Sequence, residues 1–509
     1  MVANLFSFGL LGMDAFLVNV EADLCSGLPC FELVGLPDAS VKEARDRVRS
    51  ALRNCGFSFP VSRITINLAP ADVKKGGSLY DLPILIALLS ASSQLDVPLK
   101  SSAFVGELSL FGEIRPVNGV LPMAIKANEL GIKDFYLPME NAAEGAVVEG
   151  LNVYPLKTVG ELLDHLNDKK KIPPAKPVLL RDQERSCLLD FSQVCGQYEA
   201  KRALEIAAAG GHNIMLIGPP GSGKSMLAKR LASILPNMTF EESIETTKIH
   251  SIAGTLERCV SLVHKRPFRA PHHTISAAGL AGGGNIPHPG EISLAHNGVL
   301  FLDELPEFSR SSMEVLRQPI EDGIVTISRV HGTFSYPCSI MLVAAMNPCT
   351  CGYYSHPTRP CTCSQKAVAN YLSRVSGPLL DRLDIHVEVP AVEFDELSAR
   401  GASESSQDIK ERVNKARGVQ NLRYKDSPIS CNARITSDFM QKMCPLTDAA
   451  KKLLKQAFEK LDLSARAYDR VLRVARTIAD LDEREVIEED HVAEAVQYRS
   501  LDKKYWRAR

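Results

Sequence analysis

The stretch NIMLIGPPGSGKSMLAKRLASIL, residues 213–235, decides the fold of this chain. Apolar residues run into a glycine-rich loop, and a helix with one apolar face follows. Glycines let the backbone N–H groups of such a loop wrap a phosphate chain at the positive end of the following helix. A strand, loop and helix in this order predict an α/β nucleotide-binding core. The expected phosphate-binding residues are Gly218, Pro219, Pro220, Gly221, Ser222, Gly223, Lys224 and Ser225.

ATP with Mg²⁺ is the ligand that we expect in this loop. Lys224 would reach the β- and γ-phosphates, and the Ser225 hydroxyl would ligate the metal. Further along, GVLFLDELPEF (298–308) contains a second apolar strand that ends at Asp303 and Glu304. We expect Asp303 to hold the metal and Glu304 to polarise the water that attacks the γ-phosphate. A surface acidic pair is the alternative, which the apolar run before the pair disfavours.

A third apolar strand, SIMLVAAMNP (339–348), ends at Asn347, whose side chain could orient the hydrolytic water. Two arginine-containing segments follow, SGPLLDRLDIHVEVP (376–390) and LSARAYDRVLRVARTIADL (463–481). Their order after the other motifs makes Arg382 and Arg466 candidates for neutralising charge in the transition state. The alternative for each arginine is an ion pair at the surface. Together these residues predict an ATPase.

The composition of the whole chain is that of an ordinary globular protein. The sequence has 509 residues, 45% of them apolar and 23% charged, so we expect several domains. A net charge of −1 gives no global attraction to nucleic acid or to anionic membranes, so any polyanion site must be a local patch. We find no long apolar run and no basic leader segment, and we therefore expect a cytoplasmic protein without a membrane span.

Two linker-like stretches divide the chain. Lysines followed by prolines in NDKKKIPPAKPVLLRDQE (167–184) resist both helix and sheet, and SARGASESSQD (398–408) precedes a mostly helical tail. The expected division is an α+β domain at 1–166, a linker at 167–190, an α/β ATPase core at 191–396 and a helical lid domain at 397–509.

Four cysteines gather in NPCTCGYYSHPTRPCTC, residues 347–363, directly after the third strand. In a reducing compartment they should be thiols, and four thiolates match tetrahedral zinc. Their Cys-x-Cys spacing is tighter than that of a zinc ribbon, so an ordered loop with free thiols is the alternative. His356 lies between the pairs and could replace one thiolate. We expect a structural zinc site, inside a cysteine-rich loop at 349–363, made by Cys349, Cys351, Cys361 and Cys363.

The phosphate loop together with LFLDE (300–304), AAMNPC (344–349), LLDRLD (379–384) and SARAYDRVLRVARTIADL (464–481) resembles the magnesium-chelatase-like branch of the AAA+ ATPases. The resemblance covers residues 191–509 and includes FRAPHHTISAAGLAGGG (268–284). It implies a homo-hexameric ring with ATP at the subunit interfaces. In such a ring Arg382 would be the finger that reaches the γ-phosphate of a neighbouring subunit, and Arg466 would be the second sensor.

The same resemblance implies two elements that point at the ring pore. One is an insert in the second helix, at about 262–288. The other is a hairpin before the third strand, at 323–338, whose alternation and central Gly332 independently predict two strands. Basic loops in a pore could track a DNA backbone without reading bases, whereas surface cations that stabilise the insert are the alternative. The candidate DNA contacts are Lys265, Arg266, Arg269, Arg329 and His331.

The insert also contains the adjacent pair His272 and His273. A metal site at this pair is disfavoured, because neighbouring histidines seldom converge on one ion without further ligands.

The N-terminal domain resembles the proteolytic domain of Lon, in NLAPADVKKGGSLYDLPILIALL (67–89) and in the segment 106–144. That domain uses a serine activated by a lysine. Here Leu79, not Ser78, matches the nucleophile, and Val120–Met123 stands where the lysine should be. We therefore expect a Lon-like fold without peptidase chemistry. A shift of one residue would make Ser78 the nucleophile but would leave it without the lysine.

Over its full length, including GLPDASVKEARDRVRSAL (35–52), the chain resembles the YifB/ComM family. This resemblance implies an ATP-dependent DNA translocase or helicase that promotes branch migration in homologous recombination during natural transformation. Its implied partners are single-stranded and branched DNA, and recombination proteins. One alternative is a chelatase-type remodeller of a protein or metallocofactor partner, without DNA activity. The other is an ATP-dependent protease, which Leu79 and the missing lysine disfavour.

Overall fold

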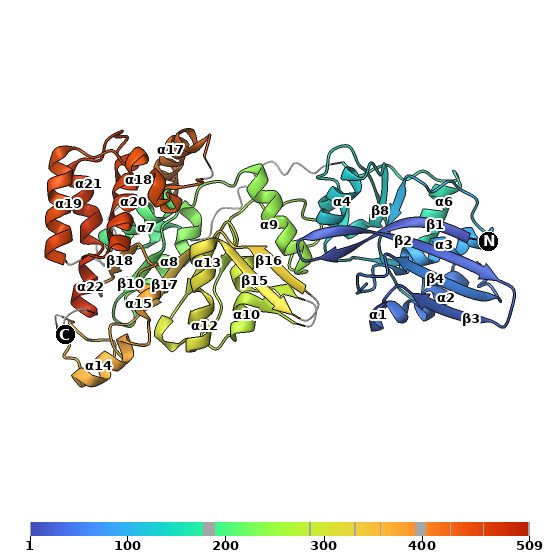
Figure 1. The fold of residues 1–509 in the computed structure, drawn as a ribbon, viewed down its shortest axis with the longest axis horizontal. Helices are drawn as coiled ribbons and strands as arrows, with labels where there is room; N and C mark the ends of the chain where they lie inside the picture. Colours follow the sequence, from blue (N-terminus) through green and yellow to red (C-terminus); the bar gives the residue numbers. More distant parts are fainter. Residues whose placement is uncertain are drawn as a thin grey trace. The chain divides into compact units, whose positions relative to one another are not determined.

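The computed structural model describes residues 2–176, 189–284, 287–329, 332–356, 358–391, 404–427, 429–461 and 463–506. The chain folds into two compact units (Figure 1). Unit 1 contains Met1–Gln183 and Phe240–Val263, and unit 2 contains Glu184–Thr239 and His264–Arg509. The segment Phe240–Val263 therefore interrupts the predicted ATPase core in sequence and joins the N-terminal unit. No helix in the described part of the chain is both long enough and apolar enough to cross a membrane.

Unit 1 is built on a mixed sheet in the order β3-β4-β2-β1-β5-β8-β9. β3 pairs with β4 in parallel, whereas β4 pairs with β2, and β2 with β1, antiparallel. The remaining pairings, from β1 through β5 and β8 to β9, are parallel. The strands are β1 Val2–Leu11, β2 Asp14–Cys25, β3 Cys30–Val34, β4 Arg63–Ala69, β5 Ser102–Phe104, β8 Asp134–Pro138 and β9 Asn152–Leu156. A small separate hairpin pairs β6 (Glu107–Leu108) with β7 (Ile114–Arg115).

The helices of unit 1 complete its core. They are α1 Ala39–Lys42, α2 Ala44–Asn54, α3 Asp81–Ala91, α4 Val120–Glu129, α5 Ala142–Gly145, α6 Val159–Leu166 and α9 Phe240–Ile252. Nearly every residue of α3 is buried, because its apolar side chains face the sheet on one side and α2 on the other. The helix α9 packs on α4, where the Gly119 N–H donates to the Ser251 carbonyl over 3.2 Å.

Unit 2 contains a parallel sheet in the order β11-β14-β17-β10-β18. The strands are β10 Ile214–Ile217, β11 Phe268–Arg269, β14 Val299–Leu302, β17 Met341–Met346 and β18 Ile385–Glu388. All residues of β10, β14 and β17 are buried, as expected for parallel strands covered on both faces. Two of the covering helices, α7 (Tyr198–Gly210) and α8 (Lys224–Ile234), pack on each other. The mixed α/β architecture predicted from the sequence is therefore present.

The expected hairpin before the third strand is confirmed, since β15 (Ile324–Arg329) pairs antiparallel with β16 (Gly332–Pro337). A second small hairpin joins β12 (Gly282–Gly283) to β13 (His288–Pro289) within the insert. The short helices around these hairpins are α10 Ala277–Ala281, α11 Glu291–Leu294, α12 Arg310–Val315 and α13 Arg317–Asp322. The Tyr336 hydroxyl of β16 donates to the Pro287 carbonyl over 2.8 Å, so hairpin and insert pack together.

Helices make up the rest of unit 2, shown in orange and red in Figure 1. They are α14 Gln365–Leu372, α15 Gly377–Leu380, α17 Ser406–Tyr424, α18 Ser437–Met443, α19 Asp448–Leu461, α20 Ala465–Leu481, α21 Glu489–Gln497 and α22 Ser500–Tyr505. Both α17 and α20 pack on α7, and their buried side chains continue the core of the sheet.

Candidate functional site

Three strand ends bring the predicted ATPase residues together. The strand β10 runs into the glycine-rich loop, and β17, the central strand of the sheet, lies between β10 and β14. Because these strands are parallel, their carboxyl ends meet at one edge of the sheet, where ligands bind in open α/β sheets. Asp303 follows β14 and Asn347 follows β17, so both come to the edge at which the loop begins.

Lys224 lies at the centre of this edge and is buried. Its Nζ donates to the carbonyls of Gly218 and Pro219, over 2.8 Å each, and to Oδ1 of Asn347 over 3.2 Å. Burial lowers the pKa of Lys224 to about 8, and Asp303 and Glu304 partly oppose that shift. The structure thus joins the predicted phosphate-binding lysine directly to the predicted water-orienting asparagine.

Ser225 and Asp303 form the part of the edge that suits a magnesium ion. The Ser225 hydroxyl donates to Oδ2 of Asp303, although the two residues come from different elements. Hydroxyl and carboxylate oxygens beside a phosphate loop are the hard ligands that Mg²⁺ takes in nucleotide sites. Ser225 and Asp303 therefore fit the Mg²⁺ ion that the sequence predicts.

Glu304 has a separate environment from its neighbour Asp303. Its backbone has a left-handed φ of 52°, and its N–H donates to Oδ1 of Asp303 over 2.9 Å. One carboxylate oxygen of Glu304 lies 3.3 Å from Nδ1 of His273, in the insert. This contact was not foreseen, because nothing in the local sequence of either residue points to the other.

The two predicted arginines lie together in a cavity of about 290 Å³ in unit 2. Arg382 forms an ion pair with Glu321 and donates to the Pro378 carbonyl over 2.7 Å, whereas Arg466 is exposed. No residue of the phosphate loop lines this cavity. The structure therefore groups the second-sensor candidate with the finger candidate rather than with Lys224.

Two further arginines of this cavity, Arg470 and Arg473, were missed. Arg470 pairs with Asp384 over 2.7 Å; burial alone would raise the pKa of Asp384, but Arg470 and His212 hold it well below its usual range. The Nε of Arg473 is buried with no hydrogen-bond partner among the described residues. Residues 466, 470 and 473 share one face of α20, and that spacing was the available signal.

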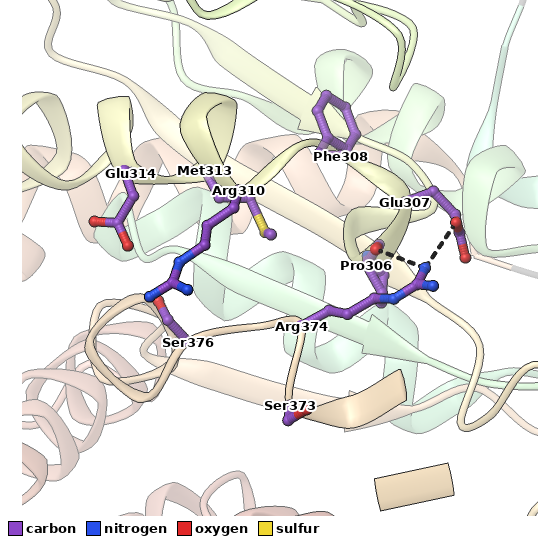
Figure 2. A pocket seen from close by; sticks show the side chains of 9 residues that line it. All are labelled: Pro306, Glu307, Phe308, Arg310, Met313, Glu314, Ser373, Arg374 and Ser376. Atoms are coloured by element: carbon purple, nitrogen blue, oxygen red, sulfur yellow. Dashed lines mark hydrogen bonds and ion pairs between the residues drawn. The ribbon is translucent and has the colours of Figure 1, made fainter. Parts of the chain in front are cut away.

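A second cavity, of about 460 Å³, lies beyond the turn that follows Glu304 (Figure 2). It is lined by the turn Leu305–Glu307, by α12 and by the loop before α15. Arg374 donates to Glu307 over 3.0 Å, and Arg310 and Ser376 are among the lining side chains drawn in Figure 2. The predicted catalytic residues do not line it.

The four predicted zinc ligands converge. Their sulfur atoms all lie within 4.8 Å of one another, and the Cys349 and Cys361 sulfurs are 3.7 Å apart. A tetrahedral site with Zn–S bonds of about 2.3 Å places its sulfurs about 3.8 Å apart, so the arrangement fits zinc. His356 is not in the cluster; its Nδ1 accepts from the backbone N–H groups of Thr358 and Arg359.

The predicted DNA contacts have different environments. Arg266 donates to the carbonyls of Pro236, Asn237 and Asn297, and Arg269 forms a two-bond ion pair with Glu291. Lys265 is exposed in the insert and Arg329 is exposed near the end of β15, whereas His331 lies outside the described residues.

The residues at the Lon-type positions of unit 1 are also placed. The Ser78 hydroxyl donates to the Glu107 carboxylate, and Leu79 is buried. Val120–Met123 begins α4 and is buried.

Similar proteins match nearly the full length of the chain. The family described as magnesium chelatase subunit ChlI matches residues 190–397, its C-terminal part matches 403–499, and a further ChlI family matches 20–141. The chain is 45% identical to competence protein ComM of Haemophilus influenzae over 505 residues, which is 98% of each chain. It is 44% identical to YifB of Escherichia coli over 495 residues, or 97% of this chain and 96% of that protein. Lon protease 2 of Bacillus subtilis is 25% identical over 182 residues, 33% of this chain and 31% of its own length.

Proposed function

This chain belongs to the YifB/ComM family of magnesium-chelatase-like AAA+ ATPases, and from that premise we propose that it is an ATP-driven DNA translocase. The work that we assign to it is branch migration in homologous recombination during natural transformation, in the cytoplasm. The name of the Haemophilus influenzae relative, a competence protein, supports this assignment.

The proposed chemistry is hydrolysis of ATP at the edge of the unit 2 sheet. We assign the β- and γ-phosphates to Lys224 and the loop Gly218–Ser225, and the metal to Ser225 and Asp303. Bound Mg²⁺ would neutralise charge on the phosphate oxygens. Asn347, whose Oδ1 lies 3.2 Å from the Lys224 ammonium, would orient the attacking water, and Glu304 would accept its proton.

We propose that the active site is completed by a neighbouring subunit in a homo-hexamer. Arg382 and Arg466 share a cavity that no phosphate-loop residue lines, which supports their delivery to the nucleotide of another copy. A positive side chain at the γ-phosphate stabilises the transition state because negative charge develops there.

The proposed DNA path follows the insert and the hairpin β15–β16. Lys265 and Arg329 are exposed and suit backbone phosphates, whereas Arg266 and Arg269 already hold carbonyl and carboxylate partners within unit 2. We therefore assign the phosphate contacts to Lys265 and Arg329, together with His331, which follows Arg329 by two residues in sequence. We assign to Arg266 and Arg269 the stabilisation of the insert.

For the domains we propose a Lon-like, non-peptidase fold at 1–166, a linker at 167–190, the ATPase core at 191–396 and a helical lid at 397–509. The segment 240–263 of that core packs with unit 1. The bond from Ser78 to Glu107 and the buried Leu79 support the absence of peptidase chemistry. We also propose that the four-cysteine cluster holds a structural zinc ion. The convergence of its sulfurs within 4.8 Å supports that ion.

The observation that carries the proposal is the joint placement of Lys224, Ser225, Asp303 and Asn347 at one sheet edge. It is tested by ATP turnover with and without forked or three-stranded DNA, together with unwinding of the fork. We expect DNA to stimulate turnover, and Lys224→Ala or Glu304→Gln to abolish it while the fold remains intact. Normal turnover in either variant would contradict the site assignment.

The second candidate, a chelatase-type remodeller, is favoured by the matches to magnesium chelatase subunit families. The same assay separates the two functions. If the protein hydrolyses ATP but neither binds branched DNA nor responds to it, the translocase function is excluded and the remodeller function is supported. Degradation of casein that Ser78→Ala abolishes would instead point to a protease.

A further inference from the structure

The four cysteines of the loop 349–363 differ in how far solvent reaches them. Cys349 is fully buried, whereas the other three, Cys351, Cys361 and Cys363, are half-buried. The sulfur atoms of Cys351 and Cys361 lie 3.5 Å apart. Two thiols that are close together and partly accessible are the kind that an oxidant converts to a disulfide.

Among the close sulfur pairs, Cys351 with Cys361 is the one that suits a disulfide. Cys349 and Cys351 are 3.3 Å apart, but they are separated by one residue and a disulfide between them would close a small, strained ring. Cys351 and Cys361 are ten positions apart, so the loop between them can close. Their sulfurs must approach by about 1.5 Å to reach the length of a disulfide bond. That approach shifts the backbone beside one or both cysteines.

The cysteine loop touches the ATP site directly beside Cys351. Gly352 is the next residue, and a Cβ atom there would lie 2.3 Å from Cδ of Pro220 in the phosphate loop. At the start of the same segment, Oδ1 of Asn347 accepts from Lys224 over 3.2 Å. A shift of Cys351 therefore reaches the phosphate loop at Pro220, and it reaches the lysine that we assign to the phosphates through Asn347.

We propose that Cys351 and Cys361 form an oxidation site that controls ATP binding. A peroxide joins the two sulfurs in a disulfide, which moves Gly352 away from Pro220 and weakens the binding of ATP. This inference rests on the assignment of ATP to the phosphate loop under the proposed function, and it does not depend on DNA. Zinc, which we assign to the same cluster, would hold the sulfurs in the reduced arrangement.

The proposed step is a two-electron oxidation of two thiolates by hydrogen peroxide. The Cys351 sulfur attacks one peroxide oxygen, the O–O bond breaks and hydroxide leaves, which gives a sulfenic acid. The Cys361 thiolate then attacks that sulfur, the S–S bond forms and a second hydroxide leaves. Two protons from solvent convert the hydroxides to water. A zinc ion that loses two of its four thiolates is released.

The test follows zinc, the disulfide and ATP binding in the full chain, before and after treatment with hydrogen peroxide. We expect release of about one zinc ion per chain, detected with a chromogenic chelator, and a Cys351–Cys361 link in peptide mapping by mass spectrometry. The Kd of a fluorescent ATP analogue should rise about tenfold, within the range typical of coupling between two sites. A thiol reductant supplied with zinc should reverse the change. Because coupling is reciprocal, saturating ATP should shift the glutathione ratio at half-oxidation by the same factor.

Three variants locate the effect. Cys361→Ser removes the partner sulfur, so peroxide should leave its Kd for the analogue at the value before treatment. Cys363→Ser keeps the reacting pair, so it should still form the disulfide and lose affinity. Cys259→Ser, at an exposed cysteine outside the cluster, should respond as the wild-type protein does.

The outcomes separate this inference from the assignments on which it draws. An unchanged Kd in protein that contains the Cys351–Cys361 disulfide overturns the inference, and so does oxidation that never links this pair. Weaker binding in peroxide-treated Cys361→Ser assigns the effect to another cysteine and also overturns it. Untreated protein that does not bind the analogue contradicts the proposed ATPase function. The disulfide and the tenfold change, found in protein with less than about half a zinc per chain, support the oxidation site and defeat the zinc assignment alone.

Discussion

At the scale of single residues, the phosphate loop depends on one glycine for its fit against the sheet. A Cβ atom on Gly218 would lie 2.1 Å from the Val389 carbonyl oxygen, just after β18. That oxygen belongs to the backbone and cannot move aside as a flexible side chain could. The loop and the end of the neighbouring strand approach this closely only because position 218 has no side chain.

We predict that Gly218→Ala will distort the loop and destabilise unit 2 by about 2 kcal/mol, as overpacking does elsewhere. Weaker ATP binding should accompany the loss, because Lys224 donates to the Gly218 carbonyl. Thermal unfolding and binding of a fluorescent ATP analogue measure both effects. Gly377→Ala is the control, since a Cβ there meets open space. Equal unfolding temperatures for both variants would show that the close approach of Gly218 to the Val389 carbonyl does not affect stability.

The residues of the ATP site were predictable because each one lies next to a local signal. Lys224 and Ser225 end a glycine-rich loop, and Asp303 and Asn347 end apolar strands, so parallel strand order alone brings them together. The contact between His273 and Glu304 was not predictable, because it joins two segments whose patterns carry no mark of each other. For the same reason the sequence could not show that Arg269 pairs with Glu291.

At the scale of elements, α9 is attached to unit 1 by a buried carboxylate. Glu144 is 3% exposed and accepts from the Leu121 N–H over 2.8 Å, from the Ser251 hydroxyl of α9 and from Asn141. Burial raises the pKa of Glu144, and the bonds from Ser251 and Leu121 oppose that shift. The sequence predicted neither this attachment nor the grouping of Phe240–Val263 with unit 1, since apolar side chains do not specify which core they enter.

We expect Glu144→Ala to destabilise unit 1 by about 2 kcal/mol, because it leaves buried donors at Leu121 and Ser251 without their acceptor. Denaturant unfolding followed by limited proteolysis within 240–263 measures the loss and locates it. Glu149→Ala removes an exposed carboxylate a few residues away and should change neither readout. If both variants unfold alike, Glu144 does not attach α9.

The cysteine loop is the other element whose packing bears on the site. Gly352, with a φ of 83°, lies against the phosphate loop so closely that a Cβ there would be 2.3 Å from Cδ of Pro220. The spacing of the cysteines predicted a cluster, and the sulfurs converge. The contact of Gly352 with Pro220 could not be predicted, because the residues between the third strand and the second cysteine pair carry no pattern that fixes the path of the loop.

We predict about one zinc ion per chain in purified protein and less than half of that in Cys361→Ser, measured by elemental analysis. The same variant should bind ATP more weakly, because its loop loses the anchor that holds Gly352 against Pro220. Cys259→Ser, at an exposed cysteine outside the cluster, serves as the control. Untreated wild-type protein with less than about half a zinc per chain would defeat the zinc assignment.

At the scale of the whole molecule, the proposed division of the ATP site between two copies is the property with the largest consequence. In one chain, Lys224 lies at the edge of the sheet, whereas Arg382 and Arg466 line a cavity that the loop does not reach. The motif order was enough to predict an ATPase with two such arginines. The sequence could not place Arg466 beside Arg382, since that depends on how α20 packs on α7 within unit 2.

We predict that Lys224→Ala and Arg382→Ala, each inactive alone, regain ATP turnover when the two chains are co-expressed and purified together. An interface between them joins an intact phosphate loop from one chain to an intact arginine from the other. Random mixing places this pairing at roughly a quarter of the interfaces of a closed ring, so about a quarter of the wild-type rate is expected. Lys224→Ala mixed with Glu304→Gln should stay inactive, because both changes damage the same half of the site. If the Lys224→Ala and Arg382→Ala mixture shows no ATP turnover although the ring assembles, Arg382 acts within its own chain or not at all.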